Sequence, residues 1–463
     1  MIKSLWFMVK IIALVAITVW IAGQPGEVVI EWGDYTFTIL MGAFIALFIG
    51  VVFLAVTLYR IVHFIASIPA KLRRRAEERA KHRGLRALTI GLSAVAAGDT
   101  DQAGKQLKRV RKYWPDEKGL PDLLAAQVAR LEGRQDAANG HFQDLLEHKD
   151  AAFLGVRGLL QAALERQDSS VALALGHKAL KLYPKQGWVL RLVCDLEIKA
   201  QNWHAAEVLL DRAVRSGAVE EDRAQSDKVA LLLLQAEQAR DKGNDGKALK
   251  FAQSALKIDP DFAPAVVRAA ALYTARGDRS KAAKIIEKAW KNAPHPDLVL
   301  PYLAAMPAKK VKDPIGKIKW IERLVKANPD SIESDLAAGQ ICIDMGLWGE
   351  ARKYLGLAEL KGADTRVYAL FAALEEKAGS PFEEVQRWRV KAANAPPAPA
   401  WVCRVSGRTY PHWQAIVLPH GSFNSLVWGD PRSGVGTAHI THGSELMQDP
   451  GVFLDAPLKS VVN

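Results

Sequence analysis

The cysteines are the first candidates for chemistry in this chain, because a thiolate can act as a nucleophile or as a metal ligand. There are three, Cys194, Cys342 and Cys403, and they lie far apart. Cys403 is followed by His412 and His420, which makes three possible donors without the spacing of a known metal motif. We therefore expect no metal site and no disulfide framework, and so few cysteines suit a reducing compartment.

Motifs for cofactor or substrate chemistry are missing from the sequence. No P-loop, GxSxG elbow or HExxH pair occurs, and the closely spaced glycines Gly434 and Gly436 lie in a Gly-, Ser- and His-rich stretch. A dinucleotide fingerprint would instead follow a strand and open a helix. His177 and His204 stand singly within predicted helices, where structural roles outnumber ligation. We predict no catalytic residue, no cofactor and no enzyme activity.

Composition places the chain among folded proteins and leaves a positive charge to explain. Of its 463 residues 49% are hydrophobic and 24% are charged, and 62 Lys and Arg against 50 Asp and Glu give a net charge of +12. Such a surplus fits either nucleic acid or a membrane surface. The position of the basic residues has to decide between the two.

The centre of the chain repeats itself, and this repeat defines the elements that would position any functional side chain. Five residues recur with a displacement of 34, namely Ala236, Gly243, Ala248, Ala255 and Pro260, as Ala270, Gly277, Ala282, Ala289 and Pro294. Small residues let two helices approach closely, the glycine allows the turn between them, and the proline follows the second helix. The unit resembles the tetratricopeptide repeat.

The turn position recurs along residues 84–394 and predicts nine repeats. Its spacing is 33 to 35 residues except for one interval of 42, which covers residues 216–225 and predicts an enlarged loop or longer helices. An alanine follows five positions later in seven repeats, and Lys317 and Glu384 are the exceptions. The alternative is a helical domain without solenoid order. The turn positions are Gly98, Gly133, Gln167, Gln201, Gly243, Gly277, Lys312, Gly346 and Gly379.

Two apolar stretches precede the repeats and predict a membrane hairpin over residues 1–66. Residues 4–22 contain one charge, Lys10, and residues 36–59 contain none. About 20 apolar residues cross a hydrocarbon core of about 30 Å, so each stretch is long enough. A cleaved signal peptide is the alternative for the first, but no small-residue cleavage site precedes Gln24 and a second span follows at once.

Charges beside the spans predict their orientation. The loop over residues 23–35 carries acidic residues and no basic one, whereas the segment 67–83 is basic, with Pro69 expected to end or kink the second helix. The positive-inside rule then places both termini in the cytoplasm, and anionic lipid attracts each such basic residue by about 1 kcal/mol. We therefore expect a membrane surface and no nucleic acid as partner. The residues concerned are Lys71, Arg73, Arg74, Arg75, Arg79, Lys81 and Arg83.

The loop also carries a family resemblance. A Pro-Gly, a short β-branched run and Trp-Gly-x-Tyr before the second span look like the N-terminal signature of the HemY family, on Pro25, Gly26, Trp32, Gly33 and Tyr35. The resemblance covers roughly the first quarter of the chain. It implies a bacterial inner-membrane tetratricopeptide protein associated with haem biosynthesis. From the residues alone, the alternative is a connector whose aromatic side chains sit at the membrane interface.

A proline-rich linker ends the array, and residues 395–429 after it resemble a rubredoxin-type zinc ribbon. An intact ribbon would have cysteines at 403, 406, 418 and 421, in two CxxC knuckles. Three of these positions hold Ser406, Leu418 and Gly421, so we expect zinc ligation to be lost. Arrays that end in such a ribbon resemble bacterial envelope-assembly adaptors. Residues 430–463 are expected to form a flexible tail.

These features together predict an all-α protein: a two-helix transmembrane hairpin, a solenoid of about nine tetratricopeptide repeats and a small irregular C-terminal segment. The first helix of each repeat would line a concave surface suited to polypeptide segments. Its mixed charges favour a polar peptide or protein surface, and the alternative is that they only solvate the groove. The side chains predicted to face it are Arg157, Gln161, Arg191, Asp195, Glu237, Arg240, Gln340 and Asp344.

Three functions compete on this basis. The first is a two-pass inner-membrane scaffold for proteins, which the HemY resemblance implies are enzymes of late haem (tetrapyrrole) synthesis. The second is an envelope quality-control adaptor linked to lipopolysaccharide or the outer membrane, motivated by the degenerate ribbon. The third is direct catalysis on porphyrin, which the missing motifs disfavour. The partner's identity, contact with porphyrin and the oligomeric state stay open.

Overall fold

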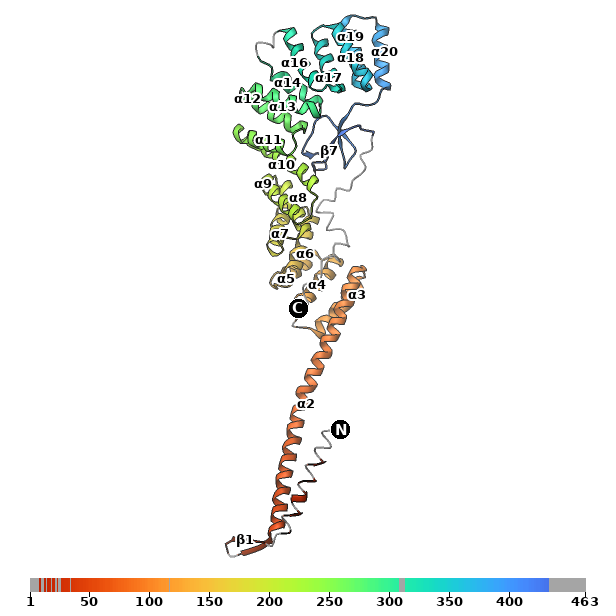
Figure 1. Ribbon diagram of the computed structural model, residues 1–463. Helices are drawn as coiled ribbons and strands as arrows, with labels where there is room; N and C mark the ends of the chain where they lie inside the picture. The colour runs from red at the N-terminus through yellow and green to blue at the C-terminus, as the bar shows by residue number, and fades with distance from the viewer. Residues whose placement is uncertain are drawn as a thin grey trace. The chain divides into compact units, whose positions relative to one another are not determined.

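The computed structural model describes residues 8–9, 12–13, 15–17, 19–20, 23, 26–33, 35–115, 117–307 and 313–432. The chain divides into two compact units, Met1–Ala138 and Asn139–Asn463. Helices dominate both units, and the strands are confined to a hairpin in the first and a small segment at the end of the second (Figure 1). The predicted helical repeat fold is therefore confirmed.

A β-hairpin precedes the long helix of the first unit. β1 (Glu27–Trp32) pairs antiparallel with β2 (Tyr35–Leu40), and Trp32 lies opposite Tyr35 across the turn. Gly33 in this turn has a φ of 61°, which glycine adopts without steric cost. The helix predicted over 36–59 therefore begins at Met41, because residues 36–40 alternate β-branched and aromatic side chains and pair with β1.

The long helix α2 (Met41–Ala96) has 56 residues. Its first part, Met41–Ile61, has a mean hydropathy of 2.6 and none of it is buried, so it is long and apolar enough to cross a membrane. The helix does not end at Pro69. A proline inside a helix costs about 3 kcal/mol. The last turns of the same helix pack on α3 (Thr100–Tyr113) through Ala87, Leu88 and Ala94.

The first predicted span, residues 4–22, lies partly outside the described residues. Those that are described, 8–9, 12–13, 15–17 and 19–20, are helical and exposed. Within the described part of the chain, Met41–Ile61 is the helix that meets the requirements for crossing a membrane.

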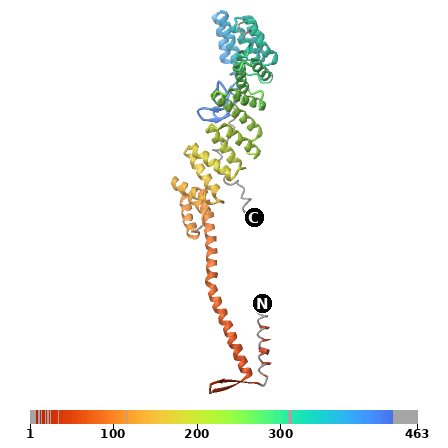
Figure 2. The ribbon, with the colours of Figure 1, turned by 90° about the vertical axis from the view of Figure 1, so that its left-hand side faces the viewer.

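Helices follow one another along the rest of the chain (Figure 1 and Figure 2). In the first unit these are α3 (Thr100–Tyr113) and α4 (Leu120–Leu131), and α5 (Gln135–Leu145) crosses into the second. The second unit continues with α6 (Ala152–Glu165), α7 (Ser169–Leu182), α8 (Gly187–Lys199), α9 (Trp203–Arg215), α10 (Glu221–Asp241), α11 (Asp245–Ile258), α12 (Ala263–Ala275), α13 (Arg279–Asn292), η1 (Pro296–Leu298), α14 (Val299–Ala304), α16 (Pro314–Ala327), α17 (Ile332–Asp344), α18 (Trp348–Gly362), α19 (Thr365–Ala378) and α20 (Phe382–Asn394).

The turn positions deduced from the sequence are confirmed at eight of nine repeats. The six glycines among them have φ between 72° and 84°, and Gln167 and Gln201 have φ of 57° and 59°. At Gly243 the glycine amide donates to Arg240 O and the next amide to Ala239 O, both at 2.8 Å, a Schellman ending of the helix. The remaining position, Lys312 of the seventh repeat, lies outside the described residues.

The alanines five positions after each turn are buried where the helices of a pair meet. All seven, from Ala103 to Ala351, are at most 1% exposed. A still closer approach occurs at Gly158, where an added Cβ would lie 2.3 Å from Cε1 of Phe142. Small side chains are needed here because packed interiors leave no room for an extra carbon. Lys317 and Glu384, the two exceptions, are half-buried.

The one long interval between repeats lengthens a helix. α10 has 21 residues, against 13 in α8 and 13 in α12. The added residues extend its N-terminal end, which carries Arg223, Ser226 and Asp227.

Residues 395–429 were predicted to be irregular, but they form a small β module. It is called the C-terminal module below. β3 (Ala400–Cys403) lies between β4 (Thr409–Tyr410) and β7 (Leu426–Gly429), and β5 (Ile416–Val417) pairs with β6 (Ser422–Phe423). Its core of Trp401, Cys403, Val417 and Leu426 packs against Phe262 of the array. Short strands suffice because the array supplies the apolar surface that so small a sheet lacks.

Candidate partner-binding site

A cavity of about 890 Å³ lies between the array and the C-terminal module. Helices α8, α9 and α10 form one side of it, and the residues around Arg404 and Phe423 of the module form the other. Charged groups from both sides reach it: Arg191, Asp195 and Asp227 from the array, and Arg404 from the module. The cavity is therefore a property of the assembled unit, since neither side encloses it alone.

The longer helix α10 holds the module in place. The Asn424 amide donates to the Ser226 hydroxyl at 3.0 Å and to the Asp227 carboxylate at 2.8 Å. The Asp227 carboxylate also accepts from Arg223 Nε at 3.2 Å. Burial raises the pKa of Asp227, and Arg223 and Asn424 oppose this. The extra residues of the fifth repeat thus provide the polar contacts that receive the module.

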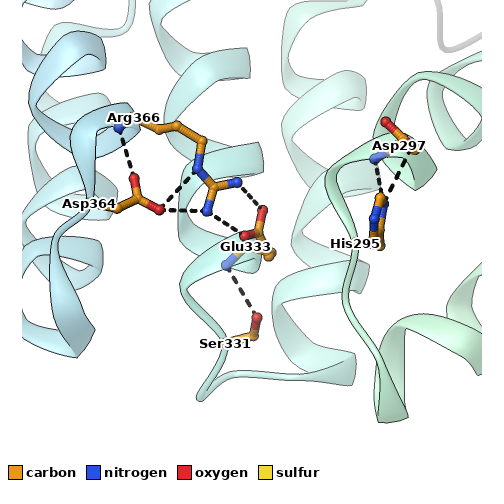
Figure 3. A network of polar contacts seen from close by, with 6 residues as sticks. All are labelled: His295, Asp297, Ser331, Glu333, Asp364 and Arg366. Atoms are coloured by element: carbon orange, nitrogen blue, oxygen red, sulfur yellow. Dashed lines mark hydrogen bonds and ion pairs between the residues drawn. The ribbon is translucent and has the colours of Figure 1, made fainter. Parts of the chain in front are cut away.

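Aromatic contacts fix the module at a second point. The ring of His295, at the start of η1, lies 4.1 Å from the Trp428 ring and 5.5 Å from the Trp401 ring, measured between centroids. Its Nδ1 accepts from the Asp297 amide at 3.1 Å, as Figure 3 shows. His295 is 5% exposed, and this burial lowers its pKa to about 4. The His295 imidazole is therefore neutral when the module is packed against the array.

A charged network ties the last repeats together next to this interface. The Arg366 guanidinium donates to both oxygens of Glu333, at 2.9 and 2.6 Å, and to Asp364 at 2.7 Å. Figure 3 shows the arginine between the two carboxylates. Such a bidentate pair fixes the angle between α17 and α19. Burial raises the pKa of Glu333, and the hydrogen bonds from Arg366 oppose this change.

Of the eight side chains predicted to line a groove, the structure brings two to the cavity. Arg191 and Asp195 line the cavity. The other six do not line that cavity, and each contacts a neighbouring side chain. The contacts are Arg157 with the Trp188 ring at 5.4 Å, Gln161 with Glu165 at 3.1 Å, Glu237 with Arg240 at 3.7 Å, and Gln340 with Asp344 at 2.9 Å.

Cys403, the cysteine at the first ribbon-like position, lies in a cluster of polar groups in the module. Cys403 is buried, with Sγ 3.3 Å from His420 Nε2 and 3.5 Å from Ser425 Oγ. Burial raises the pKa of its thiol, but hydrogen bonds from Ser406, Ser425 and the backbone outweigh burial and lower it to about 6. Leu418 at the third ribbon position is 68% exposed and offers no donor atom. Among the described residues, no group of three His, Cys, Asp or Glu could hold a metal.

The predicted membrane and loop residues all belong to the first unit. The basic set lies on α2, and its described side chains, Arg79, Lys81 and Arg83, are exposed. Of the loop signature, Gly26 accepts from the Met41 amide at 2.9 Å, Gly33 makes the hairpin turn and Tyr35 is 72% exposed. Pro25 lies outside the described residues.

Reasoning from the sequence missed the contacts of Asp227, Arg404 and Asn424, which shape the cavity. One signal pointed to them: the extra residues at 216–225, in an array of otherwise constant repeat length. An insertion in one repeat of a solenoid often marks its binding face.

Comparison with known proteins agrees with this architecture. Residues 26–133 match the family model described as the HemY protein N-terminus, and residues 239–300 match a tetratricopeptide repeat model. Protein HemY of Escherichia coli K12 is 25% identical over 386 residues, 83% of this chain and 95% of that protein. A protein described as "Probable magnetosome protein Mms48", from Magnetospirillum gryphiswaldense, is 22% identical over 428 residues, 89% of this chain and 90% of that protein.

Among solved structures, a tetratricopeptide repeat protein from Parabacteroides merdae matches with a TM-score of 0.28 and 16% identity, covering 64% of this chain and 99% of that one. The family model covers the hairpin, the long helix and the first repeats, and the repeat model covers part of the array that the turn positions define. Residues 26–133, which include the first repeats, are therefore HemY-like, and further tetratricopeptide repeats follow them.

Proposed function

We propose that this protein is a membrane-anchored scaffold, whose array binds other proteins at the cytoplasmic face of the inner membrane. One observation carries the proposal: the apolar stretch Met41–Ile61 and the first helix of the first repeat belong to the same helix, α2. Its last turns pack through Ala87, Leu88 and Ala94 on α3. Because one helix joins the anchor to the first repeat, a partner bound by the array would be tethered to the membrane.

The array is suited to binding rather than to catalysis. Stacked helical hairpins present extended surfaces for polypeptide segments. The cavity beside the C-terminal module joins apolar side chains with charged ones, as ligand-binding pockets do. The basic residues of α2 that follow the apolar stretch support a cytoplasmic array by the positive-inside rule and would contact anionic lipid.

The similarity to HemY suggests partners from late haem (tetrapyrrole) synthesis. Late porphyrins are apolar and reactive, and enzymes held at one membrane patch meet their substrates at a higher effective concentration. Binding of successive enzymes to one array would provide this without any chemistry in the array itself.

Affinity purification from membranes in mild detergent tests the proposal, with mass spectrometry of proteins and tetrapyrroles together. We expect late haem-pathway enzymes with the full chain, and a lower yield with Phe48→Lys, which places a charge in the apolar stretch. Phe48→Leu is the matched control, because it keeps the stretch apolar and should keep the yield of the wild type. Recovery of unrelated proteins alone, with normal porphyrin levels in a deletion strain, would refute the assignment to haem synthesis.

A second candidate function, an envelope-assembly adaptor, is favoured by the C-terminal module. Its turns at Gly407 and Gly421, both with φ of 68°, fall where a zinc ribbon has its knuckles. This alternative predicts lipopolysaccharide or outer-membrane defects in a deletion strain whose haem content is normal. Both phenotypes are measured in the same strain, so the two functions are separated directly.

A further inference from the structure

The β-hairpin ahead of α2 has one apolar face and one face that carries its polar side chains. Residues directly opposite each other in an antiparallel pair point to the same side of the sheet. Val28 lies opposite Ile39 and Ile30 opposite Phe37, so these four side chains share a face, and Tyr35 belongs to it by the alternation along β2. The other face carries both glutamates and both threonines of the strands, next to two apolar residues: Glu27, Glu31, Thr36, Thr38, Val29 and Leu40.

The apolar face of the hairpin is exposed. Ile30 is 37% exposed, Phe37 58% and Tyr35 72%. Within the described part of the chain, β1 and β2 form a sheet of their own. A two-stranded hairpin is at best marginally stable in water, and an apolar face needs a surface to pack against. The hairpin therefore calls for a cover that the described residues do not supply.

The hairpin is joined directly to the helix that is apolar enough to cross a membrane. β2 ends at Leu40 and α2 begins at Met41, whose amide donates to Gly26 O at 2.9 Å. In both views the strands lie across this end of α2 (Figure 1 and Figure 2). A helix that crosses a bilayer runs roughly along the membrane normal, so strands across its end run along the membrane surface. The bilayer is thus the surface nearest to the uncovered face.

We infer that the apolar face of the hairpin packs against the headgroup layer of the outer leaflet, while the face with Glu27 and Glu31 stays in water. Apolar and aromatic side chains of amphipathic segments enter this layer, and tyrosine suits it because its ring is apolar and its hydroxyl polar. A deeper position is excluded, because open edges of a sheet do not occur in hydrocarbon. This inference rests on the proposed membrane anchor and adds a second contact with lipid.

The test uses the full chain in lipid nanodiscs that hold one copy each, with an environment-sensitive fluorophore on one introduced cysteine. The three native cysteines are buried, and the wild type treated in the same way gives the background. Phe37→Cys probes the apolar face, and Thr38→Cys, the next residue of β2, is the matched control on the other face. A nitroxide-labelled lipid should quench the Phe37→Cys label at least about twofold more strongly than the Thr38→Cys label. Iodide in the water should show the reverse order.

Equal quenching at the two positions, or stronger lipid quenching at Thr38→Cys, would overturn the inference. Tyr35→Cys and Thr36→Cys repeat the comparison nearer the turn, in case Phe37→Cys disturbs the face. Protection of the Phe37→Cys label from iodide only in discs with two copies would assign the face to a second copy of the chain, and this result would also overturn the inference.

A label at Phe48→Cys separates the inference from the proposed function, because Phe48 lies in the apolar stretch Met41–Ile61. Lipid quenching there, with equal quenching at Phe37→Cys and Thr38→Cys, leaves the anchor standing and removes the contact between the hairpin and lipid. A Phe48→Cys label that iodide quenches and lipid does not would remove the anchor, and the inference with it.

Discussion

Acidification should loosen the contact between the array and the C-terminal module through His295. The imidazole is 5% exposed and packs on Trp401 and Trp428. Its Nδ1 accepts a hydrogen bond from the Asp297 amide, so a second proton can enter the ring there only if that bond breaks. Burial lowers the pKa, the Asp297 carboxylate 3.7 Å away raises it, and Arg366 lowers it further.

The direction and size of the effect follow from linkage. The pKa of His295 falls from 6.5 in the unfolded chain to about 4 in the folded one. Above pH 6.5 both states are neutral and the full stability is present. As the pH falls from 6.5 to about 4, the His295 imidazole binds a proton in the unfolded or detached state but stays neutral in the packed state. A difference of this size corresponds to about 3 kcal/mol of stability lost over that range.

Urea unfolding at pH 7, 6 and 5, followed by tryptophan fluorescence, measures this loss, because Trp401 and Trp428 lie at the interface. His295→Gln removes the titrating group and should flatten the profile between pH 6.5 and 5, while other groups titrate as before. His412→Gln is the matched control, since His412 is 78% exposed and lies 3.9 Å from the same Asp297 carboxylate. Equal slopes for the wild type and His295→Gln would refute the assignment.

Three further predictions concern the array and its contact with the module. Gln167→Gly should stabilise the chain by about 1 kcal/mol, because glycine tolerates the left-handed φ of 57°. The urea midpoint should therefore rise, and a lower midpoint would contradict this prediction. Gly158→Ala should destabilise it by about 1–3 kcal/mol in the same assay, because its Cβ would meet the Phe142 ring at 2.3 Å; wild-type stability would show that the ring moves freely. Asn424→Ala should weaken the module's attachment by about 1–3 kcal/mol, because Asp227 loses a hydrogen-bond donor. Limited proteolysis should then cleave the linker before the module faster. An unchanged cleavage rate would argue against this contact.

The sequence by itself determined the repeat. A turn with left-handed backbone and a helix pair in close contact are short-range requirements, which Gly243 and Ala248 meet within one unit and their counterparts meet again 34 residues later. The apolar stretch Met41–Ile61 could also be predicted from local sequence, because crossing a bilayer depends on composition over about 20 consecutive residues. The strand at residues 36–40 could not be predicted in this way. Its backbone hydrogen bonds are made with β1, whereas the same residues considered alone would make them within a helix.

Only the tertiary structure decided where the candidate site lies. Asn424 and Ser226 are 198 residues apart in the chain, yet their side chains meet at 3.0 Å. Nothing in the pattern around either residue specifies the other, because a contact of that range depends on how the whole array curves and how the module docks. Arg191 and Arg404 are likewise far apart in the sequence, and only the fold brings both to one cavity.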